Sequence, residues 1–115
     1  MANLSMYGSG SAGQIADLIS REVVSGALSC EIVGSVRRIA GSAEIYLLVF
    51  DKYYMRASNR ASLSVLVTGE GGRVTVDAVG AGGGQGALFR FSWGAEENFV
   101  GAVEKILRGQ GFEVQ

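Results

Sequence analysis

The chain has 115 residues with 10 basic and 11 acidic side chains, so its net charge is −1 and it lacks the basic excess typical of nucleic-acid binding. Apolar residues make up 48% of the chain and charged residues only 18%, which argues against disorder. We therefore expect one domain over residues 1–115 with a core of its own. Proline is absent and glycine occurs 18 times, so turns must use Gly, Asn and Ser.

The histidine and cysteine content excludes several classes of active site. The chain has no histidine and a single cysteine, Cys30. A Ser-His-Asp or Cys-His site and a His-ligated metal are therefore ruled out, and no intramolecular disulfide can form. We expect no catalytic residues, no metal site and no cofactor, although an enzyme that uses Asp, Glu, Lys, Arg or Tyr stays open. Cys30 itself is interpreted as an inert core thiol.

Targeting and membrane signals are weak. Residues 1–10 lack the basic and apolar regions of a signal peptide. The longest apolar run, Ile45 to Phe50, is far too short to span a bilayer. We expect a cytoplasmic, bacterial protein that contacts no membrane and no nucleic acid.

The first elements are a strand and a helix. Residues Asn3 to Tyr7 alternate in polarity, which predicts a short strand. A helix is predicted from about Ser11 to Ser25, with Ser9 or Ser11 as its cap and Gly26 as its stop. Its apolar face would hold Ile15, Leu18, Ile19 and Val23.

Consecutive strands are predicted next, because short connectors of turn residues separate segments rich in β-formers. These segments are Ser29–Arg38, Ala43–Arg56, Ala61–Thr68 and Arg73–Val79. Alternation in the first of them would place Cys30, Ile32 and Val36 on one face. The outward positions would include Tyr46, Leu48 and Leu66.

The last third of the chain contains a glycine-rich link and a helix. Gly80 to Gly86 forms the link, and Ala87 to Trp93 is an optional extra strand at 87–93. A helix follows from about Ala95 to Arg108, with Ser92 as cap and an apolar face that includes Phe99, Val103 and Ile106. The prediction is an α+β fold in the order β-α-β-β-β-β-α, with an antiparallel sheet and two helices packed on one face. This order resembles the TATA-box-binding-protein and helix-grip topology, without the matching residues of any such family.

A second resemblance is carried by sequence. Residues Gly82–Phe89 read GGGQGALF, and Phe91–Glu97 read FSWGAEE. This stretch is similar to the C-terminal signature of a small, uncharacterised bacterial family whose members have about this length. The resemblance implies no activity and no functional residues.

The candidate site residues each have a structural alternative. Backbone amides around Gly82, Gly83, Gly84 and Gln85 could cradle an anion, but the loop lacks the Gly-Lys-Ser/Thr ending of a phosphate-binding loop, so a plain connection is favoured. Trp93, beside a glycine and a helix start, is the best candidate for a partner contact.

Tyr46 and Arg37 complete the candidate set. Tyr46 belongs to an aromatic group that could contact a small apolar ligand, although core packing is the commoner role. Arg37 could join Arg38, Arg56 and Arg60 at one rim of the sheet and bind an anionic ligand, although surface solubility is the simpler explanation.

The leading functional hypothesis is a non-enzymatic binding or interaction domain that forms a homodimer. A small antiparallel sheet has two edges, and the usual guards of such edges, proline and dense charge, are missing or sparse in this sequence. The runner-up is a small-molecule-binding module with a cavity between sheet and helices. An enzyme without histidine comes third.

Overall fold

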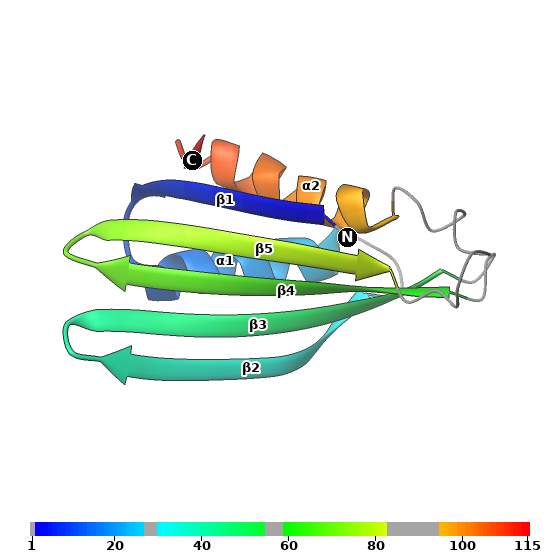
Figure 1. The fold of residues 1–115 in the computed structure, drawn as a ribbon, viewed down its shortest axis with the longest axis horizontal. Coiled ribbons are helices and arrows are strands. Elements are labelled where there is room, and N and C mark those ends of the chain that lie inside the picture. Colours follow the sequence, from blue (N-terminus) through cyan, green and yellow to red (C-terminus); the bar gives the residue numbers. More distant parts are fainter. Residues whose placement is uncertain (1, 27–29, 55–58, 83–94) are drawn as a thin grey trace.

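The computed structural model describes residues 2–26, 30–54, 59–82 and 95–115 (Figure 1). Along the chain the elements are β1 (Ala2–Ser9), α1 (Ala12–Ser25), β2 (Cys30–Ala40), β3 (Ala43–Tyr54), β4 (Asn59–Glu70), β5 (Arg73–Gly82), α2 (Ala95–Arg108) and β6 (Glu113–Val114). The predicted α+β fold and its element order are confirmed. The strand predicted at 87–93 and the cap predicted at Ser92 lie outside the described residues.

The sheet is antiparallel and has the strand order β2-β3-β4-β5-β1-β6. Two tight turns join β2 to β3 and β4 to β5, and their glycines Gly41, Gly71 and Gly72 have φ values of 60°, 61° and 81°. A left-handed backbone of this kind favours glycine, which explains these residues at the turns. The predicted pairing of β3 with β4 is confirmed, for example by Phe50 opposite Leu63.

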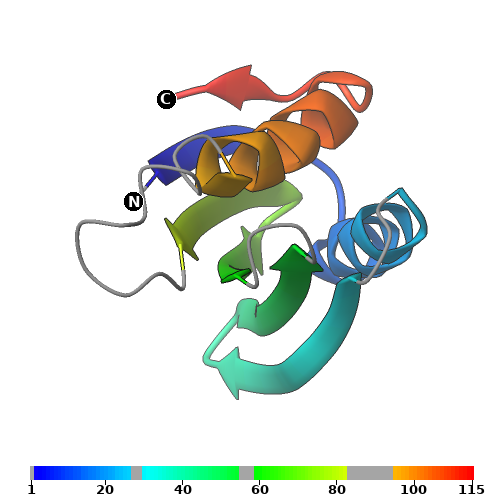
Figure 2. The ribbon, with the colours of Figure 1, turned by 90° about the vertical axis from the view of Figure 1, so that its right-hand side faces the viewer.

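Both helices pack on one face of the sheet, which we call the inner face (Figure 2). α1 lies against β2, β3 and β4, whereas α2 lies against β1, β4 and β5. Ser11 caps α1, since its hydroxyl accepts the amide of Gln14 at 3.5 Å, and the Gly26 amide closes the last turn on the Glu22 carbonyl. The helix bounds therefore follow the capping signals in the sequence.

The core fills the space between the helices and the inner face. Its largest fully buried side chains are Met6, Ile19, Phe50, Leu63, Val65, Val67, Val74, Val76, Val103 and Leu107. Ile15 and Phe99 are also buried, as predicted. Leu18 and Ile106, predicted to be buried, are only half-buried.

A β-bulge changes the faces of β2. The pairing register between β2 and β3 shifts between Ile32 and Gly34, so that Val33 is inserted without a partner of its own. Cys30 is buried on the inner face, whereas Val36 lies opposite Leu47 on the other face and is 47% exposed. The prediction that Cys30, Ile32 and Val36 share one face is therefore wrong for Val36, because one extra residue inverts the alternation.

Two further differences concern side-chain direction and strand length. Leu48, predicted to face outward, is 3% exposed and belongs to the core, and Tyr46 packs on the same inner face. The segment Gly80–Gly82, predicted as part of a link, continues β5 with Ala2 opposite Gly80 and Ala61 opposite Gly82. β6 was not predicted, since two residues carry no periodicity.

Candidate functional site

The face of the sheet opposite the helices, which we call the outer face, is not covered by any described element (Figures 1 and 2). Val36, Leu47 and Leu66 lie directly opposite one another across β2, β3 and β4 on this face. These three residues are 47%, 37% and 38% exposed, respectively. We call the apolar group on this face the outer patch; it consists of Val36, Ile45, Leu47, Val49, Leu66 and Val79.

Charged and polar groups surround the outer patch. Toward one end of the sheet the Arg60 guanidinium pairs with Asp51 at 2.5 Å. Toward the other end the Arg73 guanidinium lies over the Tyr7 ring, 5.0 Å from its centroid. An apolar centre within a polar rim is the common anatomy of a protein interface.

The second exposed feature is the free edge of β2. This strand ends the sheet on one side, so its outward backbone groups have no partner strand within the described part of the chain (Figure 1). The strand also carries exposed aliphatic residues: Ile32 (42%), Val33 (51%), Val36 (47%) and Ile39 (56%). The opposite side of the sheet ends instead in the short strand β6, which includes Glu113. Among the described strands, β2 therefore offers the longest edge of apolar character.

Two of the predicted site residues contact each other. The Arg37 Nη2 lies 2.8 Å from the Glu44 Oε2, and the Arg37 Nε donates to the Tyr46 hydroxyl at 3.1 Å. The Tyr46 hydroxyl in turn donates to the same Glu44 oxygen at 3.0 Å. The hydrogen bond from Arg37 lowers the pKa of the Glu44 carboxyl and raises the pKa of the guanidinium. Because this cluster balances its own charge, its geometry favours a structural role over anion binding.

The alternative in which arginines gather at one rim of the sheet finds no support in the positions of Arg37 and Arg60. Arg37 lies opposite Tyr46 and Arg60 opposite Tyr53, toward the two ends of β3. Each guanidinium already pairs with a carboxylate, so neither supplies an uncompensated charge. Arg56 lies outside the described residues.

Of the predicted site residues in the glycine loop, Gly82 alone lies within the described part of the chain. Gly82 is the exposed last residue of β5, opposite Ala61. Gly83, Gly84, Gln85 and Trp93 lie outside the described residues, so their roles remain predictions.

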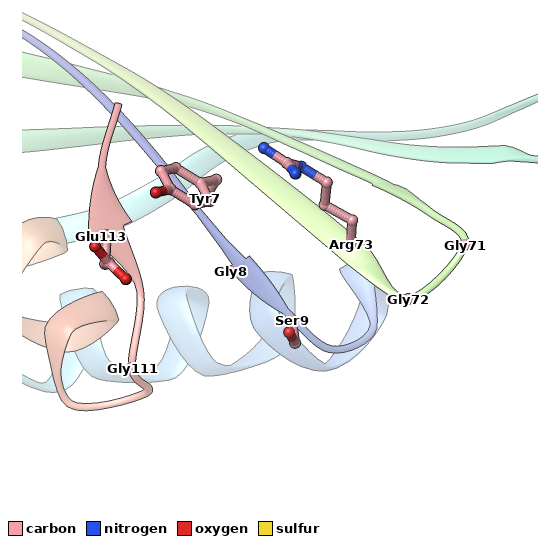
Figure 3. Close-up of a pocket in the computed structure, with 8 residues that line it drawn as sticks. All are labelled: Tyr7, Gly8, Ser9, Gly71, Gly72, Arg73, Gly111 and Glu113. Atoms are coloured by element: carbon pink, nitrogen blue, oxygen red, sulfur yellow. The ribbon is translucent and has the colours of Figure 1, made fainter.

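A pocket of about 410 Å³ opens where β1, the β4–β5 turn and the C-terminal segment meet (Figure 3). Its lining consists of Tyr7, Gly8, Ser9, Gly71, Gly72, Arg73, Gly111 and Glu113. The Arg73 and Glu113 side chains bring opposite charges to it. Sequence reasoning missed this pocket because it combines three distant segments, each of which reads as an ordinary turn or strand end.

A second pocket, of about 520 Å³, lies between the two helices. Leu18 and Glu22 line it from α1, and Ala102 and Ile106 line it from α2. The sheet contributes no lining residue to this pocket, so it differs from the cavity between sheet and helices that the small-molecule hypothesis requires.

Comparison with models of protein families identifies the family to which the chain belongs. A model described as a family of unknown function, DUF6054, matches residues 1–111. The chain belongs to the DUF6054 family. This match confirms the expected kinship with a family of unknown function, and the matched range includes the stretch from Gly82 to Glu97 on which that expectation depended. No curated protein matches the chain.

Two features bear on what this DUF6054 chain can do. No group of three or more Cys, Asp or Glu side chains within residues 2–26, 30–54, 59–82 and 95–115 could hold a metal ion. In the same part of the chain, no helix has the length and apolar character needed to cross a membrane.

Proposed function

We propose that this DUF6054 chain is an interaction domain that forms a homodimer by pairing β2 with β2 of a second copy. The observation that carries the proposal is the free β2 edge with its exposed aliphatic residues. An open edge presents unpaired amides and carbonyls, and a second strand satisfies them while covering the apolar side chains. Two identical strands can do this only in a self-complementary, two-fold arrangement.

Charge and the bulge together select a register. In an antiparallel two-fold pair centred on Val36, this residue faces its own copy, Arg38 faces Gly34 of the partner subunit, and Arg37 faces Ser35 of the partner subunit. No like charges are opposed, and Gly34 leaves space for the long Arg38 side chain. The paired segment Gly34–Arg38 stops at the bulge.

Neighbouring registers are less favourable. Centring the pair on Arg37 or on Arg38 would place two arginines directly opposite each other, which destabilises a strand pair. Centring it on Ser35 would bring the bulge at Val33 into the ladder after a single residue on each side. The Val36-centred register is thus the longest that avoids both faults.

Light scattering at micromolar concentration tests the association itself. We expect a mass of at least two chains. A mass near one chain that does not change when the sample is concentrated would contradict the proposal.

Disulfide trapping tests the register. In a Cys30→Ala background, Val36→Cys places two thiols directly opposite each other, with Cβ atoms about 5 Å apart, close to disulfide geometry. Mild oxidation should therefore produce a covalent dimer. The matched control, Arg38→Cys in the same background, separates the thiols by about 13 Å along the strands and should stay monomeric on a denaturing gel. Trapping through Arg38→Cys but not Val36→Cys would exclude this register.

A further inference from the structure

We infer that two such dimers pack with their outer faces together, so that the outer patch is buried in a four-chain assembly. The assembly rests on the β2 pairing proposed above, whereas the packing of the outer faces has observations of its own. The occupant of the outer patch is thus a second copy of this chain.

The pattern of β3 indicates a strand that is covered on both sides. Residues 45–50 form a continuous apolar run, in which Tyr46, Leu48 and Phe50 face the helices, and Ile45, Leu47 and Val49 face outward. A strand with one face in water normally alternates apolar and polar residues, and a continuous run is typical of a strand buried on both faces. Within the described fold only the inner face of β3 is covered.

In the proposed dimer, the two-fold symmetry places the uncovered outer faces of both copies on the same side of one continuous sheet. An antiparallel pair at a sheet edge requires a two-fold axis perpendicular to the sheet, so both copies keep their helices on the same side. The row of Leu66, Leu47 and Val36 then continues into the same three residues of the partner subunit. The dimer therefore has one helix-covered side and one bare side on which the two outer patches are continuous.

The size and anatomy of the outer face suit a second layer of sheet. With strands about 4.8 Å apart and a rise of about 3.3 Å per residue, the outer face of one chain covers roughly 600–900 Å². A stable interface buries about 800 Å² per partner, so this face reaches the required scale. Its charged residues border the patch: Asp77 lies opposite Leu66, Arg38 lies opposite Ile45, and the Asp51–Arg60 pair lies toward one end of the sheet. Two sheets with inward apolar faces pack about 10 Å apart as a sandwich.

Two surface substitutions test the β2 edge pairing and the packing of the outer faces independently of each other. Leu47→Lys places a charge at the centre of the outer patch, where the half-exposed native residue leaves room for it in an isolated chain. Ser35→Lys places a lysine opposite Arg37 of the partner subunit, and its matched control Ser35→Glu places a carboxylate there instead. Gln14→Lys, on the exposed side of α1, controls for added charge.

The masses of these variants by light scattering test the inference. We expect four chains for the wild type, Gln14→Lys and Ser35→Glu, and two chains each for Leu47→Lys and Ser35→Lys. A circular dichroism spectrum equal to that of the wild type confirms that a variant is folded, and Leu66→Lys replaces Leu47→Lys if it is not.

The remaining outcomes assign any failure to one interface. If the wild type has two chains, and Ser35→Lys but not Leu47→Lys reduces it to one, the edge pairing is supported and the packing of outer faces is contradicted. A wild type of two chains that only Leu47→Lys dissociates overturns the edge pairing and the four-chain assembly. A wild type of one chain overturns both.

Discussion

Phe99 is the bulkiest side chain that the described part of α2 buries, with 4% of its surface exposed. Replacing it with alanine removes this contact and leaves a cavity between α2 and the sheet. We expect Phe99→Ala to lower the free energy of unfolding by about 3–5 kcal/mol, measured by urea denaturation. Ile106→Ala, at a half-buried position of the same helix, should cost less. A decrease in the free energy of unfolding of less than about 1 kcal/mol for Phe99→Ala would show that this face of α2 is exposed to water.

Gly69 and Gly101 should respond in opposite directions to the same substitution. A Cβ at Gly69 would lie 2.7 Å from the Ala12 Cβ and 3.1 Å from its backbone nitrogen, at the start of α1. A Cβ at Gly101, inside α2, meets nothing within 4 Å.

We therefore expect Gly69→Ala to destabilise the fold by about 1–3 kcal/mol, because α1 must shift away from β4. Gly101→Ala should stabilise it by about 0.5–1 kcal/mol, because alanine loses less backbone entropy in a helix. Thermal and urea unfolding of the two variants check this pair, and equal effects would contradict the close approach of α1 to β4.

The Cys30 thiol should be unreactive in the folded chain. Burial raises its pKa, and the nearby Lys52 only partly opposes this effect. Since the thiolate is the nucleophile, we expect alkylation by iodoacetamide at pH 8 to be at least about tenfold slower in the folded chain than in urea. Equal rates would show an accessible thiol.

The same pKa shift has a consequence for stability. The folded state holds the thiol proton more tightly than the unfolded state, so ionisation favours unfolding. The free energy of unfolding should fall as the pH rises above the ordinary pKa of a thiol, and it should fall less in Cys30→Ala.

At the scale of elements, β3 and β2 show why the sequence predicts strands better than it predicts their faces. The β-formers and short turns were enough to locate both strands. In β3, however, residues on both faces are apolar, so alternation could not reveal that Leu48 faces inward. In β2 the bulge at Val33 placed Val36 on the outer face. Gly34, next to Val33, is a weak local sign of such a bulge, and simple alternation does not take it into account.

The ends of the sheet depend on contacts between distant segments. Gly80–Gly82 reads as a loop because glycine has a low strand propensity. These residues are extended because β4 pairs with all three of them and β1 pairs with Gly80 from the other side. β6 forms likewise only because Val114 meets Met6 after the chain returns past α2. Tertiary pairing of this kind has no signal in local composition, and the same holds for the pocket beside Tyr7 and Arg73.

At the scale of the whole molecule, association couples stability to concentration. If two or more chains assemble, dilution favours the separated and unfolded states by mass action. We expect the melting temperature to rise by several degrees when the concentration is raised a hundredfold, followed by calorimetry. A variant with Ser35→Lys and Leu47→Lys together should show a melting temperature independent of concentration. A wild type that behaves like this double variant would indicate a monomer.

The bulge at Val33 also bears on solubility. A long, flat, apolar edge recruits further chains without limit and is the starting point of amyloid-like growth. The insertion of Val33 bends β2 and breaks its ladder, so the regular part of the edge begins only at Gly34. A single extra residue thereby divides the edge into a short segment that one partner can fill and a twisted segment that cannot template a fibre. In the proposed dimer, the chain would thus keep an apolar edge for one partner without the aggregation hazard of a fully regular edge.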